Sequence, residues 1–398
     1  KKGFTAFRIV ESSASAQRNP VIPPDLNFCA ECQREFNDPD DRRHGYPFIN
    51  CINCGPRFTI VQDIPYDRRK TSMHGFRMCA ECRREYRTPT TRRFHAEPNA
   101  CPACGPGLSF FDAAGRKMAP LDVVAEAAGR LRQGEVLAVL GMGGFHLTCL
   151  ATSTEAVEKL RQRKRRPHKP LAVMAKDISQ ARRFVRIRPA EMELLASPRR
   201  PIVLLEKTDD GPLSPLIAPG NGRVGVMLPY TPLHQLLLDA VGGPIVATSG
   251  NVSGAPIITD PAEGMKRLRG IADHYVVHDR PIVNHCDDSV TMYAPALRKE
   301  LLVRRSRGFV PVPLRPPVPF TNRILAVGGQ MKSVFCLGMG DKAVLSQHLG
   351  DLDDFEMYSS FERDLSFFER TLGFAPEIIA HDLHPDYAST NYALRQAG

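Results

Sequence analysis

Four Cys-x2-Cys pairs, all before residue 105, constrain this chain more than any other feature of its sequence. Eight of the eleven cysteines lie in these pairs, which form two units of the pattern C-x2-C-x18-C-x2-C. The first unit contains Cys29, Cys32, Cys51 and Cys54, and the second contains Cys79, Cys82, Cys101 and Cys104. Two Cys-x2-Cys turns supply the four thiolates of a tetrahedral zinc site. The spacing therefore predicts two zinc ions.

We interpret both predicted zinc ions as structural. Four thiolates leave zinc no open position for a substrate, so the metal would stabilise the fold of a small module. Each unit is complete by itself, which favours pairing within a unit over pairing across the two. Arg42-Arg43 of the first unit recur as Arg92-Arg93 of the second. Docking between domains is the favoured role of the two zinc modules, and contact with RNA is the alternative.

The composition is typical of a folded protein with more than one domain. The chain has 398 residues, 42% of them hydrophobic and 24% charged, which predicts two to three domains. It contains no apolar run long enough for a membrane span and no secretory signal at its first residues, so we expect a cytoplasmic protein without a membrane partner. Residues 129–183 carry twelve Lys/Arg against four Asp/Glu, whereas residues 320–398 carry six against eleven. A local anionic ligand fits this distribution better than binding of nucleic acid over the whole surface.

The order of apolar and turn-forming segments predicts an α/β protein with several domains. Residues 1–27 resemble the end of a preceding domain and a linker, and residues 28–110 form the zinc module. From 120 to 316 helical and strand patterns alternate, which predicts an α/β domain with a parallel or mixed sheet. The proline-rich segment 311–320 indicates a boundary. Residues 321–398 then read as the start of a further α/β domain.

Two short stretches in the 120–316 region point to a nucleotide. Residues 163–170 (RKRRPHKP) place five cations in eight positions, and the prolines bias the residues before them towards extended backbone. Residues 248–254 (TSGNVSG) follow the apolar run 244–247, which reads as a buried strand. Ligands of open α/β sheets bind at strand ends, and small residues there allow close approach. Taken alone, residues 163–170 could be an ordinary solvated basic run. Residues 248–254, taken alone, could be an ordinary turn.

Together the two stretches resemble the YrdC family, in the pattern KxRPxKP followed by SxN. That family binds ATP and joins a carbamoyl-type acid to AMP with release of pyrophosphate. The resemblance implies that Lys164, Arg166 and Lys169 clamp phosphates, and that Ser249, Gly250 and Asn251 contact the phosphates or the acyl group. It also implies nucleotide contacts from the later basic turn, of which Arg305 and Arg307 are the candidates. We expect Lys164, Arg166, Ser249 and Asn251 to be catalytic and Mg²⁺ to accompany ATP.

The whole chain resembles the HypF family of carbamoyltransferases. The resemblance lies in the paired cysteine units with their CGPRF-like turn (residues 54–58), the YrdC-like stretches, and the segments AVGGxxK (326–332), LSQHxGDL (345–352) and DLHPDYxST (382–390). It implies an acylphosphatase-like domain before residue 28, a YrdC-like domain with a twisted mixed sheet, and the start of an actin-like, Kae-type domain. The implied activity is ATP-dependent formation of carbamoyl-AMP from carbamate or carbamoyl phosphate. The carbamoyl group would pass to the C-terminal cysteine of a HypE-type protein during maturation of [NiFe]-hydrogenases.

Parts of the HypF pattern are absent from this sequence. The acylphosphatase motif GxVQGVxFR and the metal motif HHHAH do not occur, so we interpret the chain as the central piece of a longer protein. Residues 143–147 (GGFHL) lack the hydroxyl side chains found there in threonylcarbamoyl-AMP synthases, which favours carbamate as the acid. The alternatives are a threonylcarbamoyl-AMP synthase-like enzyme, an O-carbamoyltransferase, and a zinc-knuckle RNA-binding module.

Two further sets of residues receive plain interpretations. Asp287 and Asp288 could hold magnesium or cap a turn, and we favour the turn. The remaining cysteines, Cys149, Cys286 and Cys336, stand in apolar contexts and read as small buried side chains instead of nucleophiles.

Overall fold

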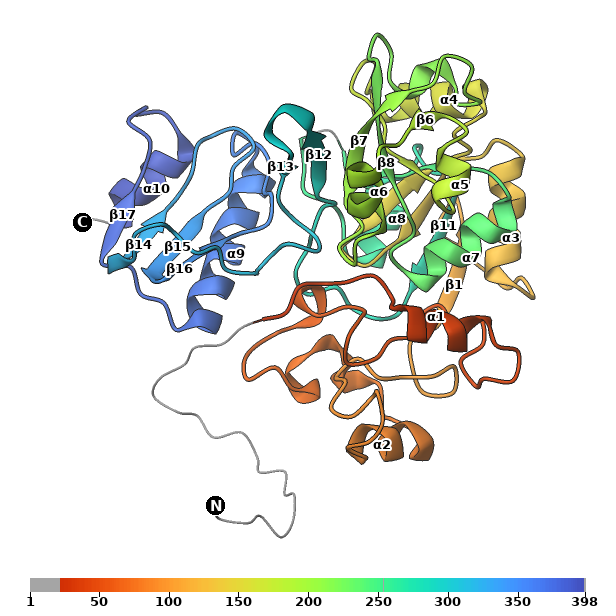
Figure 1. Ribbon diagram of the computed structural model, residues 1–398, viewed down its shortest axis with the longest axis horizontal. Coiled ribbons are helices and arrows are strands. Elements are labelled where there is room, and N and C mark those ends of the chain that lie inside the picture. Colours follow the sequence, from red (N-terminus) through yellow and green to blue (C-terminus); the bar gives the residue numbers. More distant parts are fainter. Residues whose placement is uncertain (1–21, 253, 397–398) are drawn as a thin grey trace.

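The computed structural model describes residues 22–252 and 254–396, which form three units (Figure 1). A cysteine-rich module lies below a central α/β unit, and a smaller α/β unit lies beside the central one. The prediction for residues 1–27 falls mostly on residues outside the described ranges. In the described part of the chain, no helix has the length and apolar character needed to cross a membrane.

The cysteine-rich module consists of two similar halves held mostly by loops and short helices. Its elements are α1 (Ala30–Asn37), η1 (Phe58–Ile60), η2 (Arg68–Lys70), η3 (Ser72–Gly75) and α2 (Ala80–Arg87). Helices α1 and α2 each begin directly after the first cysteine of a unit, so Cys29 and Cys79 are the N-caps. A small apolar core containing Phe28, Phe36 and Phe48 fills the first half.

Arginines of each half of the module form ion pairs with a glutamate of the other half. Arg43 of the first half is 1% exposed and donates to Glu85 of the second at 2.6 Å, while Arg93 of the second pairs with Glu35 of the first. The preceding arginines, Arg42 and Arg92, bind the same two glutamates. The recurring arginine pairs therefore join the halves to each other. Docking between domains, the role favoured for the module as a whole, rests on other residues, such as Phe58, which packs against Phe368 of another unit.

Breaking one of these exchanged pairs should be costly. We expect Arg43→Ala to lower the free energy of unfolding by about 3 kcal/mol, because it leaves Glu85 without its buried partner. Arg34→Ala removes the exposed pair with Glu31 in the same module and should cost less than about 1 kcal/mol. Guanidinium unfolding at saturating zinc measures both. An equal loss of unfolding free energy in the two variants would show that the ion pairs between the halves contribute no more than an exposed pair.

The central unit contains two sheets. The first has the strand order β10-β4-β3-β11-β1-β2, and the second has the order β13-β12-β7-β8-β5-β9, with β6 paired to β7. The strands are β1 (Leu108–Asp112), β2 (Lys117–Met118), β3 (Leu137–Leu140), β4 (Phe145–Thr148), β5 (Val173–Met174), β6 (Val185–Arg186), β7 (Ile202–Lys207), β8 (Arg223–Met227), β9 (Ile245–Val246), β10 (Thr248–Ser249), β11 (His274–His278), β12 (Val290–Ala294) and β13 (Lys299–Arg304). Both sheets mix parallel and antiparallel neighbours.

Helices cover these sheets. They are α3 (Val123–Arg132), α4 (Thr154–Lys164), α5 (Ile178–Ala181), α6 (Pro189–Ala196), α7 (Pro232–Val241) and α8 (Pro261–Arg267), and η4 (Pro215–Ile217) and η5 (Pro295–Leu297) are 3-10 turns. Helices α3 and α7 contribute to one apolar core together with β3, β5 and β11. A second core contains α4 and the opposite faces of the strands. Both sheets are thus buried at their centres, as their nearly continuous apolar runs require.

The structure corrects three details predicted from the sequence. The single strand expected over Ile245–Thr248 is two strands, because the chain passes from the second sheet to the first at Ala247. Lys164 ends helix α4, so the basic strip is not extended from its first residue. The first helix of the 120–316 domain begins only at Val123, so Leu121 precedes it and is fully exposed.

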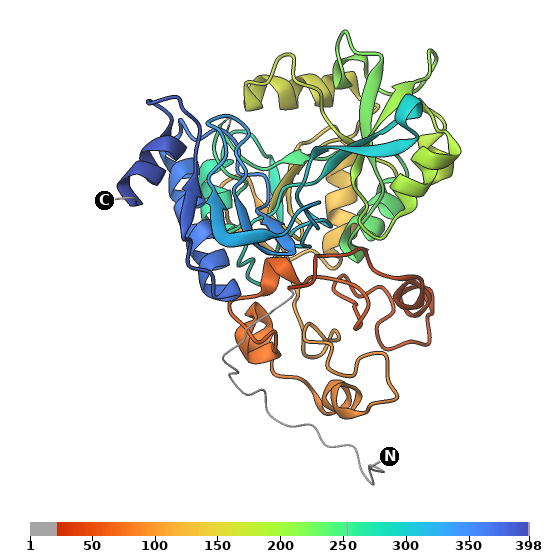
Figure 2. The ribbon, with the colours of Figure 1, turned by 60° about the vertical axis from the view of Figure 1, so that its left-hand side comes forward.

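The C-terminal unit is a four-stranded sheet of order β16-β15-β14-β17 with two helices. Its elements are β14 (Phe320–Ala326), β15 (Cys336–Gly340), β16 (Lys342–Leu345), α9 (Phe355–Leu372), β17 (Ile378–Ala380) and α10 (Ala388–Gln396). Helix α9 packs Phe361, Leu365 and Phe368 into a core with the sheet. The same core includes Phe58 and Val61 of the cysteine-rich module, so the two units share buried apolar surface (Figure 2).

Candidate functional site

The basic strip is held in place by an arginine that precedes it. Arg161 is 5% exposed, and its guanidinium donates to the carbonyls of Arg166 at 2.7 Å and Pro167 at 3.0 Å, among others. Arg165, just after α4, adopts the left-handed conformation with φ 52° and turns the chain away from the helix axis. The strip therefore combines the last turn of a helix with a short loop whose backbone carbonyls are bound by Arg161.

The second stretch forms a tight turn beside β4. Ser249 pairs with His146 across the two strands, and the amide of Gly250 donates to the carbonyl of Phe145 at 2.5 Å. A Cβ atom at Gly250 would lie 2.4 Å from the Cβ of Phe145, so only glycine fits. The side-chain amide of Asn251 donates to the carbonyl of Ala255 at 2.6 Å. This turn brings its polar groups to the end of the sheet.

Lys164 joins the strip to the turn. Its ammonium group donates to the carbonyl of Ser249 at 2.6 Å, and to the carbonyl and Oδ1 of Asn251, both at 2.9 Å. Ser249 Oγ also donates to that Oδ1 at 2.9 Å. Burial, with a further contribution from the charge of Arg166, lowers the pKa of Lys164 to about 7. Lys164 is thus a buried amine whose charge depends on what binds next to it.

Three other cations surround Lys164 and are less fully engaged. Arg166 donates to Thr248 Oγ1 at 3.2 Å, but its Nε has no partner in the described part of the chain. Lys169 is exposed overall, but partial desolvation of its amine and the charges of Arg166 and Arg304 lower its pKa. Burial and neighbouring arginines likewise lower the pKa of Arg166 to about 10. Such crowded cations favour binding of a polyanion, because an anion relieves their repulsion.

Arg305 and Arg307 bond to other groups of the protein. Arg307 is 1% exposed, pairs with Asp288 at 2.7 Å and lies 3.4 Å above the ring of Tyr230. The Nη2 of Arg305 donates to the carbonyls of Phe309 and Val312. Of this basic turn, Arg304 is the residue whose charge reaches Arg166 and Lys169.

Asp288 is part of a buried network instead of a surface turn. Its second carboxylate oxygen lies 3.0 Å from Nε2 of His146, and the charge of Arg307 holds its pKa well below the usual range against the effect of burial. Asp287, the adjacent residue, is half-buried, and its charge reaches Lys164 and Lys169. Neither side chain belongs to a cluster of three or more metal-ligating residues among those described.

The C-terminal unit contributes to the surroundings of the strip. His348 is buried enough to lower its pKa to about 4, and its electrostatic neighbours include Arg304, Asp287 and Lys169. Asp351 also acts on Lys169. Sequence reasoning missed His348, Asp351 and Arg161, because nothing in their local sequence indicates which residues of other units they approach. The sequence of one segment does not show which residues of another unit lie next to it.

The eight predicted metal ligands form two clusters. Within each unit the four sulfurs lie within 4.8 Å of one another, as in Cys29–Cys51 at 3.6 Å and Cys79–Cys101 at 3.8 Å. Zn–S bonds of about 2.3 Å in a tetrahedron place sulfurs roughly 3.8 Å apart, whereas a disulfide brings them to about 2.05 Å. Each cluster therefore fits a zinc ion, and the ligands pair within a unit as the spacing predicts.

The remaining cysteines are poor nucleophiles. Cys149 and Cys286 are buried, and burial raises the pKa of the Cys149 thiol to about 12. Burial raises the pKa of Cys286 and of the partly buried Cys336 as well. Thiols that stay protonated do not attack, so these three side chains serve packing.

Family models match most of the chain. The model described as HypF finger matches residues 28–61 and 78–111, the one described as Telomere recombination (Sua5, YciO and YrdC) matches 130–306, and the HypF Kae1-like domain matches 320–398. The predicted fold class, with its zinc-finger module, YrdC-like domain and start of a Kae-type domain, is confirmed.

Similar proteins carry the HypF name. The chain is 50% identical over its full length to the carbamoyltransferase HypF of Synechocystis sp. and 45% identical over 98% of its length to that of Rhodobacter capsulatus. It spans about half the length of these relatives, 51% and 52%. A threonylcarbamoyl-AMP synthase of Bacillus subtilis is 34% identical over 38% of this chain and 45% of its own.

Solved structures agree with the sequence matches. A full-length HypF in the phosphate- and nucleotide-bound form superimposes with a TM-score of 0.90 at 45% identity, covering 94% of this chain and 49% of that one. HypF of T. kodakarensis gives a TM-score of 0.91 at 40% identity, with 96% and 50% covered.

Proposed function

Because this chain belongs to the HypF family, we propose that its central unit forms carbamoyl-AMP from carbamate and ATP. One observation carries the proposal: Lys164 and Arg166 bond to residues 248–251, the turn that contains Ser249 and Asn251, and the charge of Arg166 reaches Lys169. A carbamate oxygen attacks the α-phosphorus of ATP, the bond to the β-phosphate oxygen breaks, and pyrophosphate leaves with the electron pair. Negative charge grows on the phosphoryl oxygens, and preorganised cations stabilise it.

The residues divide into two roles. Lys169 and Arg304 would bind the phosphates directly, and Arg166 would join them by giving up its bonds to Thr248 and the carbonyl of Pro170. Lys164, Ser249 and Asn251 form an internal network that fixes the turn, and they become ligands when the triphosphate displaces one of their mutual bonds. Gly250 supports the same turn by close approach. Arg305 and Arg307, first considered as nucleotide ligands, support the turn after β13.

Further parts of the proposal concern what surrounds this reaction. Mg²⁺ would enter with ATP as part of the substrate, and two zinc ions would serve structure alone. The carbamoyl group would go on to the C-terminal cysteine of a HypE-type protein, during maturation of [NiFe]-hydrogenases, through the Kae-type domain that begins at residue 320. The reduced cysteine clusters favour a cytoplasmic setting.

An ATP–pyrophosphate exchange assay tests the proposal. Bicarbonate with ammonia supplies carbamate, and we expect exchange of labelled pyrophosphate into ATP to depend on both. Exchange that requires threonine with bicarbonate would instead support a threonylcarbamoyl-AMP synthase-like activity. Zinc-dependent RNA binding without any exchange would favour the RNA-binding module, although Arg43 and Arg93 are already engaged with glutamates.

Nucleotide binding should take up a proton above neutral pH. The pKa of Lys164 is about 7 without ligand, so at pH 8 this amine is mostly neutral, and a nearby triphosphate raises its pKa. ATP affinity should therefore fall as pH rises from 7 to 9, by at most about tenfold per unit. Calorimetry in two buffers of different ionisation enthalpy measures the uptake. Lys164→Met should abolish it, and uptake that persists in this variant would assign the proton to another group.

A further inference from the structure

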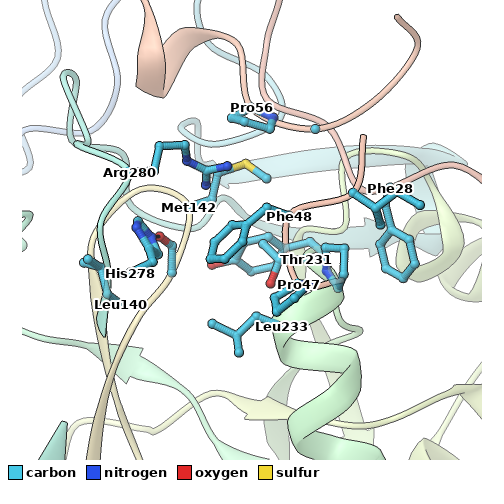
Figure 3. Close-up of a pocket in the computed structure, with 15 residues that line it drawn as sticks. Phe28, Pro47, Phe48, Pro56, Leu140, Met142, Thr231, Leu233, His278 and Arg280 are labelled. Carbon is cyan, nitrogen blue, oxygen red and sulfur yellow. Dashed lines mark hydrogen bonds between the residues drawn. The ribbon is translucent and has the colours of Figure 1, made fainter. Parts of the chain in front are cut away.

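A small pocket lies between the cysteine-rich module and the central unit (Figure 3), and no residue of the basic strip lines it. Its walls include Phe48 and Pro56 from the module, and Met142, Leu233 and Arg280 from the central unit. The cavity volume is about 20 Å³, which holds between one and two water molecules or an ion of similar size. A nucleotide does not fit there, so this pocket is separate from the proposed adenylation site.

Arg280 is the unusual feature of this pocket. It is 6% exposed, and its guanidinium lies 5.3 Å from the ring centre of Phe48. In the described part of the chain, no carboxylate forms an ion pair with this guanidinium, although the charges of Asp25 and Asp279 act on it, and its Nε has no hydrogen-bond partner. Burial lowers the pKa of Arg280 to about 10, which leaves it charged at neutral pH. A buried charge without a partner is costly, and a bound anion would remove that cost.

The other polar group in the pocket is a neutral histidine. Nε2 of His278 donates to the carbonyl of Gly141 at 3.0 Å, so its Nδ1 carries a lone pair, and that atom has no partner. Burial, together with the charge of Arg280, lowers the pKa of His278 to about 3. The pocket thus offers one cation, one free acceptor and flat apolar walls.

These groups define the class of ligand. A single guanidinium binds two coplanar oxygens of a monoanion, whereas a phosphate dianion would need further cations. The volume limits the ligand to about four heavy atoms. Bicarbonate and carbamate meet both conditions, and their OH or NH₂ group can donate to a free acceptor such as His278 Nδ1.

We propose that the Arg280 pocket binds a small planar monoanion of the bicarbonate–carbamate class. This choice of class rests partly on the proposed function, which consumes such an acid, but occupancy of the pocket does not depend on adenylation. A short run of backbone links the pocket to the surroundings of the basic strip. Gly141 and Met142 line it, and the carbonyl of Gly143, in the same turn, accepts from the amide of Cys286, next to Asp287. Binding there would place the acid on the far side of this turn from the nucleotide.

Isothermal titration with sodium bicarbonate, on the zinc-loaded chain without ATP or ammonia, tests the proposal. Sodium chloride and sodium phosphate at equal ionic strength are the comparison ions. We expect saturable binding of bicarbonate that weakens at least tenfold in Arg280→Met and remains in Arg200→Met, which removes another largely buried arginine. Lys164→Ala should bind bicarbonate normally while losing pyrophosphate exchange, so failure of the site and failure of the proposed function are distinguishable.

Several results would overturn the site. Absence of saturable heat with bicarbonate, equal affinity for phosphate, or unchanged binding in Arg280→Met would each exclude it. If Arg280→Met does not fold, a crystal structure of the wild-type chain soaked in bicarbonate decides. Density for a planar ion against the guanidinium of Arg280 supports the proposal, and a pocket that contains only water contradicts it.

Discussion

Replacing Lys164 by alanine should reduce carbamate-dependent ATP–pyrophosphate exchange by about 100-fold or more. Lys164 is the group that ties the strip to the turn, with three acceptors within 2.9 Å. Its loss removes a positive charge from the site of developing phosphoryl charge and frees Asn251 to move. Loss of one preorganised donor typically costs 10²–10³ in rate.

A neighbouring cation provides the matched control. Arg165 is exposed, and its side chain makes no hydrogen bond or ion pair among the described residues. Arg165→Ala should leave the exchange rate within about twofold of the wild-type value. Thermal unfolding of both variants checks that they fold. If Lys164→Ala retained near wild-type exchange, or if Arg165→Ala lost as much, the assignment of the strip would be wrong.

Losing a zinc ligand should have the largest effect on stability. Cys82 is fully buried and belongs to the second cluster, where it also accepts hydrogen bonds from Arg42 and Arg43 of the other half. We expect Cys82→Ser to lower the zinc content from two ions to one and to destabilise both halves of the module. Structural zinc contributes roughly 10–16 kcal/mol of apparent binding energy in isolated fingers, so the loss should exceed that from any single core contact.

Metal analysis and thermal unfolding check this prediction. Cys336→Ser is the control, because Cys336 is partly buried and lies outside both clusters. It should retain two zinc ions and lower the midpoint only slightly. A Cys82→Ser variant that still bound two zinc ions would contradict the ligand set. A variant with one ion and an unchanged midpoint would contradict the coupling of the halves through their arginines.

The sequence predicted most elements because their signals are local. The Cys-x2-Cys spacing predicted the pairing within each cluster, and the apolar run 378–380 predicted β17 with the bounds that the structure gives. The strand over Ile245–Thr248 was harder. Ile245, Val246 and Ala247 are all apolar, and apolar character alone does not show that Ala247 separates two sheets. That passage matters, since it delivers Ser249 to the edge beside His146.

Charged residues were the least predictable part of the site. Arg304, Arg305 and Arg307 are close in the sequence and equally basic, yet the charge of Arg304 is the one that reaches the strip. Arg305 donates to carbonyls of the following loop, and Arg307 is bound to Asp288. The arginines that join the halves of the module were equally hard to assign from the sequence. Repetition of Arg42-Arg43 as Arg92-Arg93 indicated a shared role, but a partner that lies in the other repeat is visible only in three dimensions.

The most direct test of adenylation is the fate of an oxygen atom. In the proposed reaction a carbamate oxygen becomes bonded to the α-phosphorus, and cleavage of the adenylate between carbon and oxygen leaves that atom in AMP. With freshly prepared ¹⁸O-labelled bicarbonate, ammonia and ATP, mass spectrometry should find AMP that carries one ¹⁸O in short incubations, and none in Lys164→Ala. AMP without the label, or ADP as the sole product, would contradict the formation of carbamoyl-AMP by this chain.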